Sequence, residues 1–245
     1  MTIDSIQNTP VGGDNIFVFI VAAGSGTRFG ASIPKQFLPL NGKPVLAHTV
    51  EAIHSALPQA RIILVLSDDG RSLWDKVVQD HNIPDASIVK GGASRSESVS
   101  NALSIIDRAD ENTVVLIHDG ARPLVNADMI QALVRRIMKK DIQAVVPALP
   151  LTEAIAEIHG DCLLSANREK FRTVQTPQAF KAAVLIDAYK KADGTIMADD
   201  AAIAATFGGI DIHFVNGHPQ NIKITHPGDL AVAESIMADP KPYQD

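Results

Sequence analysis

The chain has 245 residues, of which 46% are hydrophobic and 20% are charged, and its net charge is −6. This composition is typical of a soluble globular protein, and the acidic balance argues against bulk binding to nucleic acid or to an anionic membrane surface. The single cysteine, Cys162, excludes an intrachain disulfide and a cysteine-rich metal site.

The N-terminus is polar and lacks the apolar core of a signal peptide, and no stretch approaches the ~20 apolar residues that span a bilayer. We therefore expect a cytoplasmic protein without a membrane partner. Residues 1–15 are interpreted as a flexible leader, residues 16–238 as a single domain and residues 239–245 as a tail.

Apolar, β-branched runs alternate with longer amphipathic segments, which is typical of a parallel sheet covered by helices. The predicted strands are Ile16–Ala22, Arg61–Ser67, Ser87–Val89, Thr113–His118, Ala144–Pro147 and Asp211–Val215. The predicted helices are Pro44–Ser55, Arg71–His81, Ser96–Asp107, Asn126–Lys139, Lys181–Lys191, Asp199–Phe207 and Pro227–Ala238. The pattern indicates an α/β fold, with a Rossmann-like, mostly parallel sheet sandwiched by helices and ligands bound outside the carboxyl ends of the strands.

One region, at about residues 150–178, breaks this alternation. Short strand-like pieces, EAIAEI and KFRTVQT, surround His159-Gly160-Asp161, which predicts a protruding β-hairpin arm. Because an arm that leaves a compact core commonly packs on a second subunit, we expect a homodimer formed through it.

Residues 21–37, VAAGSGTRFGASIPKQF, follow the first predicted strand as a glycine-rich loop, which can bring backbone amides close to a phosphate. A dinucleotide fingerprint needs a third glycine where Phe29 stands, and the Gly-Lys-Ser/Thr of a Walker A loop is absent. Two cations, Arg28 and Lys35, lie beyond the glycines instead. Cleavage of a triphosphate pushes charge onto the leaving pyrophosphate, so these cations favour a reacting nucleoside triphosphate over a glycine turn with solvated basic side chains.

The segment AAGSGTRFG…IPKQFLPLNGKPVL resembles the opening signature of the sugar-nucleotide-type nucleotidyltransferases. Its PKQF version is similar to cytidylyltransferases that make CDP-alcohols from CTP and a polyol phosphate, most closely the branch that uses 2-C-methyl-D-erythritol 4-phosphate in the non-mevalonate isoprenoid pathway. Four more motifs keep the same order: GGASRSESV (91–99), HDGARP (118–123), TPQAF (176–180) and NIKIT (221–225). The resemblance extends from about Phe17 to about Glu234.

The resemblance implies a role for each residue that matches a family motif. The catalytic cations would be Arg28, Lys35 and Lys223. Nucleotide binding would fall to Ala22, Ala23, Gly24, Gly26, Gly91, Gly92, Ser98 and Gly120, together with Arg28 and Lys35. The polyol phosphate would meet Asp119, Arg122, Thr152, Arg168, Thr176 and Lys223, with Thr152 contributed across the dimer. As a carboxylate at the end of a strand, Asp119 is also the expected Mg²⁺ ligand.

Three positions depart from the family pattern. Ala93 stands where some members carry an acidic residue, Leu151 replaces an aspartate before Thr152, and Ala198 replaces a substrate-contacting threonine. The last two concern the acceptor, so a ribitol 5-phosphate cytidylyltransferase stays open as an alternative. A non-catalytic nucleotide-binding sensor is the other alternative, and Phe29 disfavours a dehydrogenase.

Overall fold

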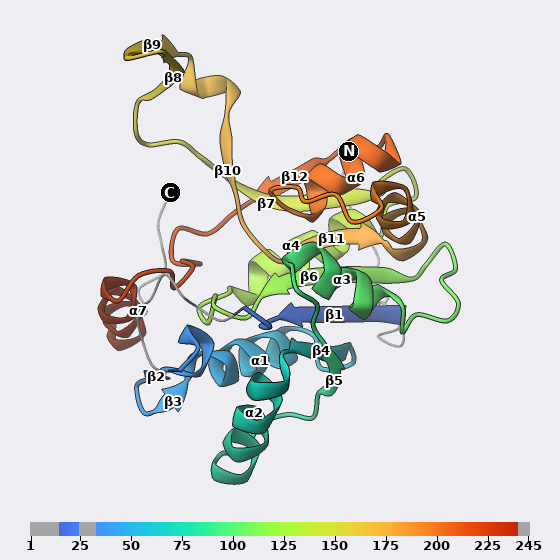
Figure 1. Ribbon diagram of the computed structural model, residues 1–245, viewed down its shortest axis with the longest axis vertical. Coiled ribbons are helices and arrows are strands. Elements are labelled where there is room, and N and C mark those ends of the chain that lie inside the picture. Colours follow the sequence, from blue (N-terminus) through green and yellow to red (C-terminus); the bar gives the residue numbers. More distant parts are fainter. Residues whose placement is uncertain (1–14, 25–32, 240–245) are drawn as a thin grey trace, which may run out of the picture.

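A central eight-stranded sheet organises the computed structural model, which describes residues 15–24 and 33–239 (Figure 1). Its strand order is β10-β7-β11-β6-β1-β4-β5, with β12 paired to β7. The strands are β1 (Ile16–Val21), β4 (Arg61–Leu66), β5 (Ser87–Lys90), β6 (Val114–Asp119), β7 (Ala144–Pro150), β10 (Arg172–Val174), β11 (Gln178–Lys181) and β12 (His213–Asn216). Strands β6, β1, β4 and β5 are mutually parallel, which confirms the predicted mostly parallel sheet.

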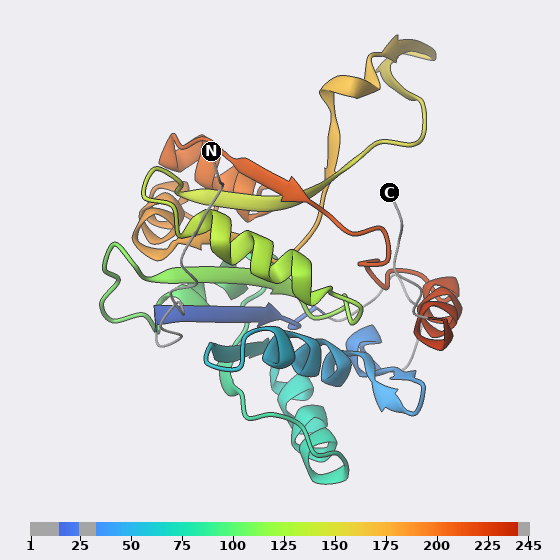
Figure 2. The ribbon, with the colours of Figure 1, turned by 180° about the vertical axis from the view of Figure 1, so that it is seen from behind.

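Helices cover the two faces of the sheet: α1 (Val45–Ala56), α2 (Asp68–Asp80), α3 (Arg95–Leu103), α4 (Ala127–Ile137), α5 (Ala182–Ala192) and α6 (Asp200–Gly208). A further helix, α7 (Gly228–Ala238), packs instead in a small cluster with Leu40 and Val45. Side chains alternate along β1, so Val18 and Ile20 pack with α1, α2 and α4 on one face, while Phe19 packs with α3, α5 and α6 on the other. Figure 1 shows the face that carries α3, and Figure 2 shows the face that carries α1 and α4.

Every predicted strand and helix has a counterpart in the structure, although most of their ends are shifted. Helix α2 begins at Asp68 because the Ser67 hydroxyl accepts from Gly70 N at 3.1 Å and caps the helix. Helix α3 ends at Leu103, four residues before the predicted end, and a turn follows. The sequence patterns did not indicate the short hairpin of β2 (Pro39–Leu40) and β3 (Lys43–Pro44), nor β11, which inserts antiparallel between β6 and β7.

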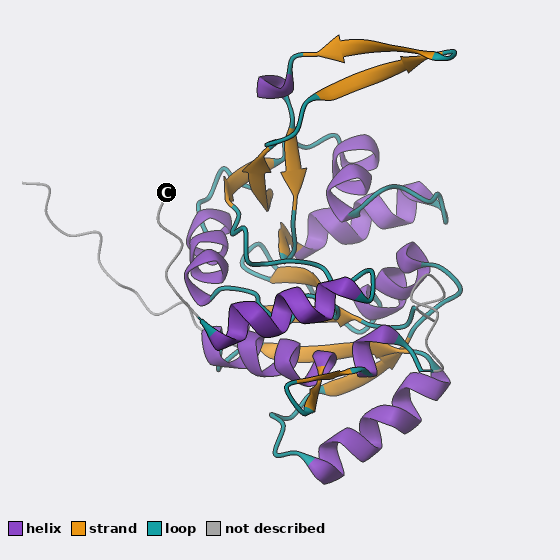
Figure 3. Ribbon diagram, turned by 90° about the vertical axis from the view of Figure 1, so that its left-hand side faces the viewer, coloured by secondary structure: helices purple, strands orange, loops and turns teal. Residues whose placement is uncertain are grey.

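A β-hairpin stands away from the body of the molecule (Figure 3). Strand β8 (Ile155–His159) pairs antiparallel with β9 (Cys162–Ala166), and Gly160 has a positive φ of 63° at the predicted turn. Contrary to expectation, KFRTVQT is not the second strand of this hairpin, because its residues Arg172–Val174 form β10 and pair with β7. The role of the hairpin in dimerisation stays a prediction.

None of the described helices is long and apolar enough to cross a membrane. The division into leader, domain and tail stays a prediction, since residues 1–14 and 240–245 lie outside the described residues. The cytoplasmic location also stays a prediction.

Candidate active site

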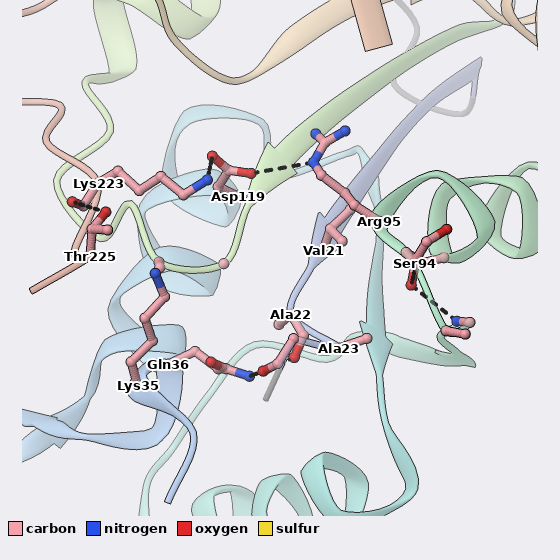
Figure 4. A pocket seen from close by; sticks show the side chains of 16 residues that line it. Val21, Ala22, Ala23, Lys35, Gln36, Ser94, Arg95, Asp119, Lys223 and Thr225 are labelled. Atoms are coloured by element: carbon pink, nitrogen blue, oxygen red, sulfur yellow. Dashed lines mark hydrogen bonds and ion pairs between the residues drawn. The ribbon is translucent and has the colours of Figure 1, made fainter. Parts of the chain in front are cut away.

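A cavity of about 550 Å³ opens where β1, β5 and β6 end. Because these strands are parallel, the segments that follow them meet at one edge of the sheet. The cavity is lined by Val21, Ala22, Ala23, Gly24, Lys35, Gln36, Gly92, Ala93, Ser94, Arg95, Ser98, Asp119, Gly120, Ala121, Lys223 and Thr225. Figure 4 shows that Lys35, Arg95 and Lys223 approach it from three separate segments.

The loop after β1 is held by Gln36, which belongs to the short 3₁₀ helix η3 (Lys35–Phe37). The buried side-chain amide of Gln36 donates to Ala22 O at 2.7 Å and to Gly24 O at 3.0 Å. These bonds fix the first residues of the predicted phosphate loop and place the neighbouring Lys35 at the cavity. Two predicted site residues, Gly26 and Arg28, fall in residues 25–32, outside the described residues.

Two predicted glycines allow the loops to meet closely. A Cβ on Gly91 would lie 2.3 Å from Ala23 Cβ, and one on Gly120 would lie 2.8 Å from Ala22 Cβ. Contacts this short are closer than real Cβ atoms approach, so any side chain would push the loops apart. Gly91 itself does not line the cavity, and its role is to let the loop after β1 pack against the loop after β5.

The loop after β5 is closed by hydrogen bonds from its own side chains. The Ser98 hydroxyl accepts from Gly92 N at 3.0 Å and donates to Ser94 O at 2.8 Å. The Glu97 carboxylate accepts from Ala93 N at 2.7 Å. These hydrogen bonds fix the conformation of the loop that carries Gly92 and Ser98, which are predicted to bind the nucleotide. Ala93 takes part through its backbone N–H.

Asp119 is the centre of charge in the cavity. Its Oδ2 lies 3.0 Å from Lys223 Nζ and its Oδ1 lies 3.8 Å from Arg95 Nε (Figure 4). The same Oδ2 lies 3.3 Å from Arg122 Nε. Burial alone raises the pKa of Asp119, but Lys223, Arg95 and Arg122 more than offset this and hold the pKa well below its usual range. Asp119 is therefore an anion at neutral pH, with three cations around it.

Behind Asp119, His118 and Thr176 form a buried hydrogen-bonded pair. Burial lowers the pKa of His118 to about 4, so the ring is neutral at pH 7. Its Nε2 lies 3.2 Å from Arg122 O, which can only accept, so Nδ1 must accept from the Thr176 hydroxyl at 3.0 Å. The same hydroxyl accepts from Asp119 N at 3.1 Å. Thr176, predicted to hold the substrate phosphate, therefore has its hydroxyl turned toward Asp119.

Contacts from Arg122 and Asn221 explain why Lys223 points into the cavity. Arg122 Nη1 donates to Asn221 O at 2.7 Å, and Asn221 Nδ2 donates to Thr176 O at 2.9 Å. Ile224 N donates to Ala121 O at 2.9 Å. These bonds dock the segment around Lys223 against the end of β6, while Arg122 itself stays outside the cavity lining.

The remaining predicted site residues, Thr152 and Arg168, lie on the arm. Arg168 Nη1 donates to Thr152 O, both residues are exposed, and neither lines the cavity of its own chain. The structure therefore brings Ala22, Ala23, Gly24, Lys35, Gly92, Ser98, Asp119, Gly120 and Lys223 together, and it leaves the two arm residues outside.

Sequence reasoning missed Arg95 and its buried partners. Arg95 Nη2 donates to Asp200 Oδ2 at 2.7 Å, and Tyr189 OH donates to Asp200 Oδ1 at 2.6 Å. The available signal was the position of Arg95 just after a helix cap, where a cation is unfavourable. No sequence pattern pointed to Asp200 and Tyr189, because they lie on other helices than Arg95 and meet it only when the helices pack together.

The cavity is built to bind and neutralise anions. Within residues 15–24 and 33–239, its lining offers three cations, Lys35, Arg95 and Lys223, against one carboxylate, Asp119. Among the residues that the structure describes, no group of three or more His, Cys, Asp or Glu side chains could hold a metal ion on its own.

Comparison with known proteins gives consistent matches. A family model described as 2-C-methyl-D-erythritol 4-phosphate cytidylyltransferase matches residues 16–239. A relative of that name from Azobacteroides pseudotrichonymphae is 38% identical over 222 residues, which cover 90% of this chain and 98% of the relative. One from Bacteroides fragilis is 36% identical over 220 residues, which cover 89% of this chain and 97% of the relative.

Solved structures under the same name are also similar. The enzyme from Francisella tularensis gives a TM-score of 0.75 at 30% identity and covers 90% of this chain and 99% of its own. The enzyme from Thermus thermophilus gives a TM-score of 0.71 at 30% identity and covers 91% of this chain and 99% of its own.

Proposed function

The chain belongs to the family of 2-C-methyl-D-erythritol 4-phosphate cytidylyltransferases, and we propose that it transfers the cytidylyl group of CTP to 2-C-methyl-D-erythritol 4-phosphate in the non-mevalonate isoprenoid pathway. The observation that carries the proposal is the cavity in which the loop after β1, Lys35, Asp119 and Lys223 meet. The matched residues, 16–239, include every segment that lines it.

The reaction joins two anions. A phosphate oxygen of the acceptor forms a bond to the α-phosphorus of CTP, the bond from that phosphorus to the β-phosphate oxygen breaks, and pyrophosphate leaves with the electron pair. The attacking oxygen is already anionic at neutral pH, so no general base is needed. This agrees with the described part of the cavity, where the one carboxylate, Asp119, is kept ionised and the nearby His118 is buried and bonded to backbone and Thr176.

Catalysis then depends on positioning and charge neutralisation. Lys35 and Lys223 approach the cavity from opposite ends of the chain, and we assign them to the triphosphate and the crowded α-phosphorus. Arg28 is assigned the same task from the loop after β1. Asp119 keeps Lys223 at 3.0 Å and so holds that ammonium group at the cavity wall.

We include Mg²⁺ in the proposal, because one carboxylate at the cavity could bind it together with the substrate phosphates. Asp119 is the one carboxylate among the described residues that line the cavity, and Mg²⁺ commonly binds through one or two carboxylates together with substrate phosphates. Because Lys223 and Arg122 contact the same carboxylate, the site suits an ion that arrives with CTP. The ion would supply further neutralisation of the phosphate charge.

We also propose that the arm mediates a homodimer. Three apolar side chains at its tip, Ile158, Leu163 and Leu164, are 79%, 70% and 53% exposed. Ile158 and Leu163 stand opposite each other on one face of the hairpin. A partner surface that covers this face would remove apolar area from water and could bring Thr152 and Arg168 to the partner's cavity.

Release of pyrophosphate from CTP tests the function. The purified protein is supplied with Mg²⁺, CTP and one acceptor at a time: 2-C-methyl-D-erythritol 4-phosphate, ribitol 5-phosphate or none. We expect release with the first acceptor. No release with any acceptor would favour the nucleotide-binding sensor, and preference for ribitol 5-phosphate would overturn the assigned substrate.

A further inference from the structure

Arg95 occupies a position where a helix disfavours a cation. It is the first residue of α3, immediately after the Ser94 cap, and it lines the cavity. The N-terminal end of a helix carries partial positive charge, so an arginine there costs stability. Local conflicts of this kind are expected where function outweighs stability.

A buried carboxylate compensates for this charge. Asp200 is fully buried at the start of α6, and its Oδ2 accepts from Arg95 Nη2 at 2.7 Å. Its Oδ1 accepts from Tyr189 OH at 2.6 Å, so both carboxylate oxygens are engaged. Burial alone lowers the pKa of Arg95, but the charge and hydrogen bond of Asp200, together with the charge of Asp119, more than offset this and raise the pKa. Arg95 therefore stays charged.

The ion pair also sets the direction of the guanidinium. With Nη2 tied to Asp200, the Nε edge lies 3.8 Å from Asp119 Oδ1, and Lys223 contacts the other oxygen of Asp119 at 3.0 Å. Arg95 and Lys223 thus flank one carboxylate from two sides (Figure 4). Without the tie to Asp200, the guanidinium could close on Asp119 as a shorter pair and compete with Lys223 for it.

We propose that Asp200, supported by Tyr189, is a positioning residue that holds Arg95 as a further cation of the reaction site, facing the anionic substrates across Asp119 from Lys223. The inference rests on the cytidylyl transfer proposed above. It assigns no contact with substrate to Asp200, which acts through Arg95 alone.

A double-mutant cycle on pyrophosphate release tests the inference. Asp200→Asn keeps the shape of the side chain and removes its charge, and we expect kcat/KM to fall about tenfold to a hundredfold, the cost of a displaced catalytic group. Arg95→Gln should lose at least as much. The double variant should lose no more than Arg95→Gln, because Asp200 then has no arginine to position. The control Asp187→Asn, which breaks an exposed pair with Lys191, should stay within about twofold.

Tyr189→Phe provides a milder variant in case Asp200→Asn fails to fold. It removes only the hydroxyl that supports Asp200, so kcat/KM should fall by a smaller factor, and this fall should vanish in the Arg95→Gln background. Additive losses in an active enzyme would overturn the inference and assign Asp200 to the fold alone. An Asp200→Asn variant that unfolds at a lower temperature but has a normal kcat/KM below that temperature would also overturn the inference. Absence of turnover in the wild-type protein would instead overturn the proposed function on which the inference rests.

Discussion

Asp119 shows how single residues set the charge of this cavity. Three cations, Arg95, Arg122 and Lys223, reach it from different segments, and its backbone N–H is held by Thr176. The carboxylate of Asp119 thus fixes the positions of these cations. Two of them, Arg95 and Lys223, line the cavity and lie beside the space for the substrates. Substitution of a side chain that faces the cavity should affect turnover more than folding. Substitution of one that lies behind the cavity should affect folding more than turnover.

Lys35 is a cavity-facing case. Lys35→Ala should lower kcat by about 10²- to 10³-fold, the usual cost of removing one preorganised group that stabilises transition-state charge. Its unfolding temperature should stay close to that of the wild type. Steady-state pyrophosphate release and thermal unfolding measure the two effects. Lys76→Ala, at an exposed lysine on α2, is the matched control, and a near-normal rate for Lys35→Ala would remove this lysine from the mechanism.

Thr176 lies behind the cavity. Thr176→Val keeps the volume but leaves Asp119 N and His118 Nδ1 without their partner, so the free energy of unfolding should fall by about 1 to 3 kcal/mol. Thr176→Ser, which keeps the hydroxyl, should recover most of the loss. Denaturant titration measures both variants. Unchanged stability combined with a raised KM for the acceptor would instead support direct contact with the substrate phosphate.

At the scale of elements, buried parallel strands were the easiest to predict. Strand β1 is a continuous apolar run, and β6 is apolar as far as Ile117, because both faces of these strands are covered. Strand β11 was missed because Pro177 and the polar Gln178 mask a strand that runs antiparallel inside a parallel sheet. The pairing of Arg95 with Asp200 was also beyond reach, since it depends on how α3 and α6 dock on the same sheet face.

The arm is the element whose role is most open to test. Leu163→Glu places a charge on the apolar face that Leu163 shares with Ile158, and we expect it to convert the dimer to a monomer. His159→Glu, on the opposite face of the hairpin, should leave the dimer intact. Sedimentation equilibrium measures the mass, and a wild-type monomer, or a Leu163→Glu dimer, would contradict the assigned role.

Mixed dimers test whether the arm serves the partner's cavity. Lys35→Ala and Arg168→Ala proteins should each be nearly inactive alone, and refolding them together should restore activity. In the mixed dimer, one cavity keeps its own Lys35 and receives an intact Arg168 from its partner. Two inactive parents whose mixture stays inactive would show that Arg168 acts within its own chain.

In the whole molecule, the cavity joins segments from both ends of the described chain. Its charge suits CTP that binds as a complex with Mg²⁺. We expect calorimetric titration to show little Mg²⁺ binding to the free protein and clear binding in the presence of CTP, because Lys223 and Arg122 contact the carboxylate of Asp119. Chelation of the metal should stop pyrophosphate release, and added Mg²⁺ should restore it. Tight binding of Mg²⁺ to the free protein would contradict this arrangement.

Leu151 and Ala198 depart from the family pattern at two positions that concern the acceptor, so the identity of the acceptor is the property to measure. A competition experiment addresses it directly: the protein receives CTP, Mg²⁺ and equal concentrations of 2-C-methyl-D-erythritol 4-phosphate and ribitol 5-phosphate, and mass spectrometry identifies the products at early times. We expect CDP-methylerythritol in large excess, with an equal amount of pyrophosphate. CDP-ribitol as the main product, or no CDP-alcohol at all, would contradict the assignment of 2-C-methyl-D-erythritol 4-phosphate as the acceptor.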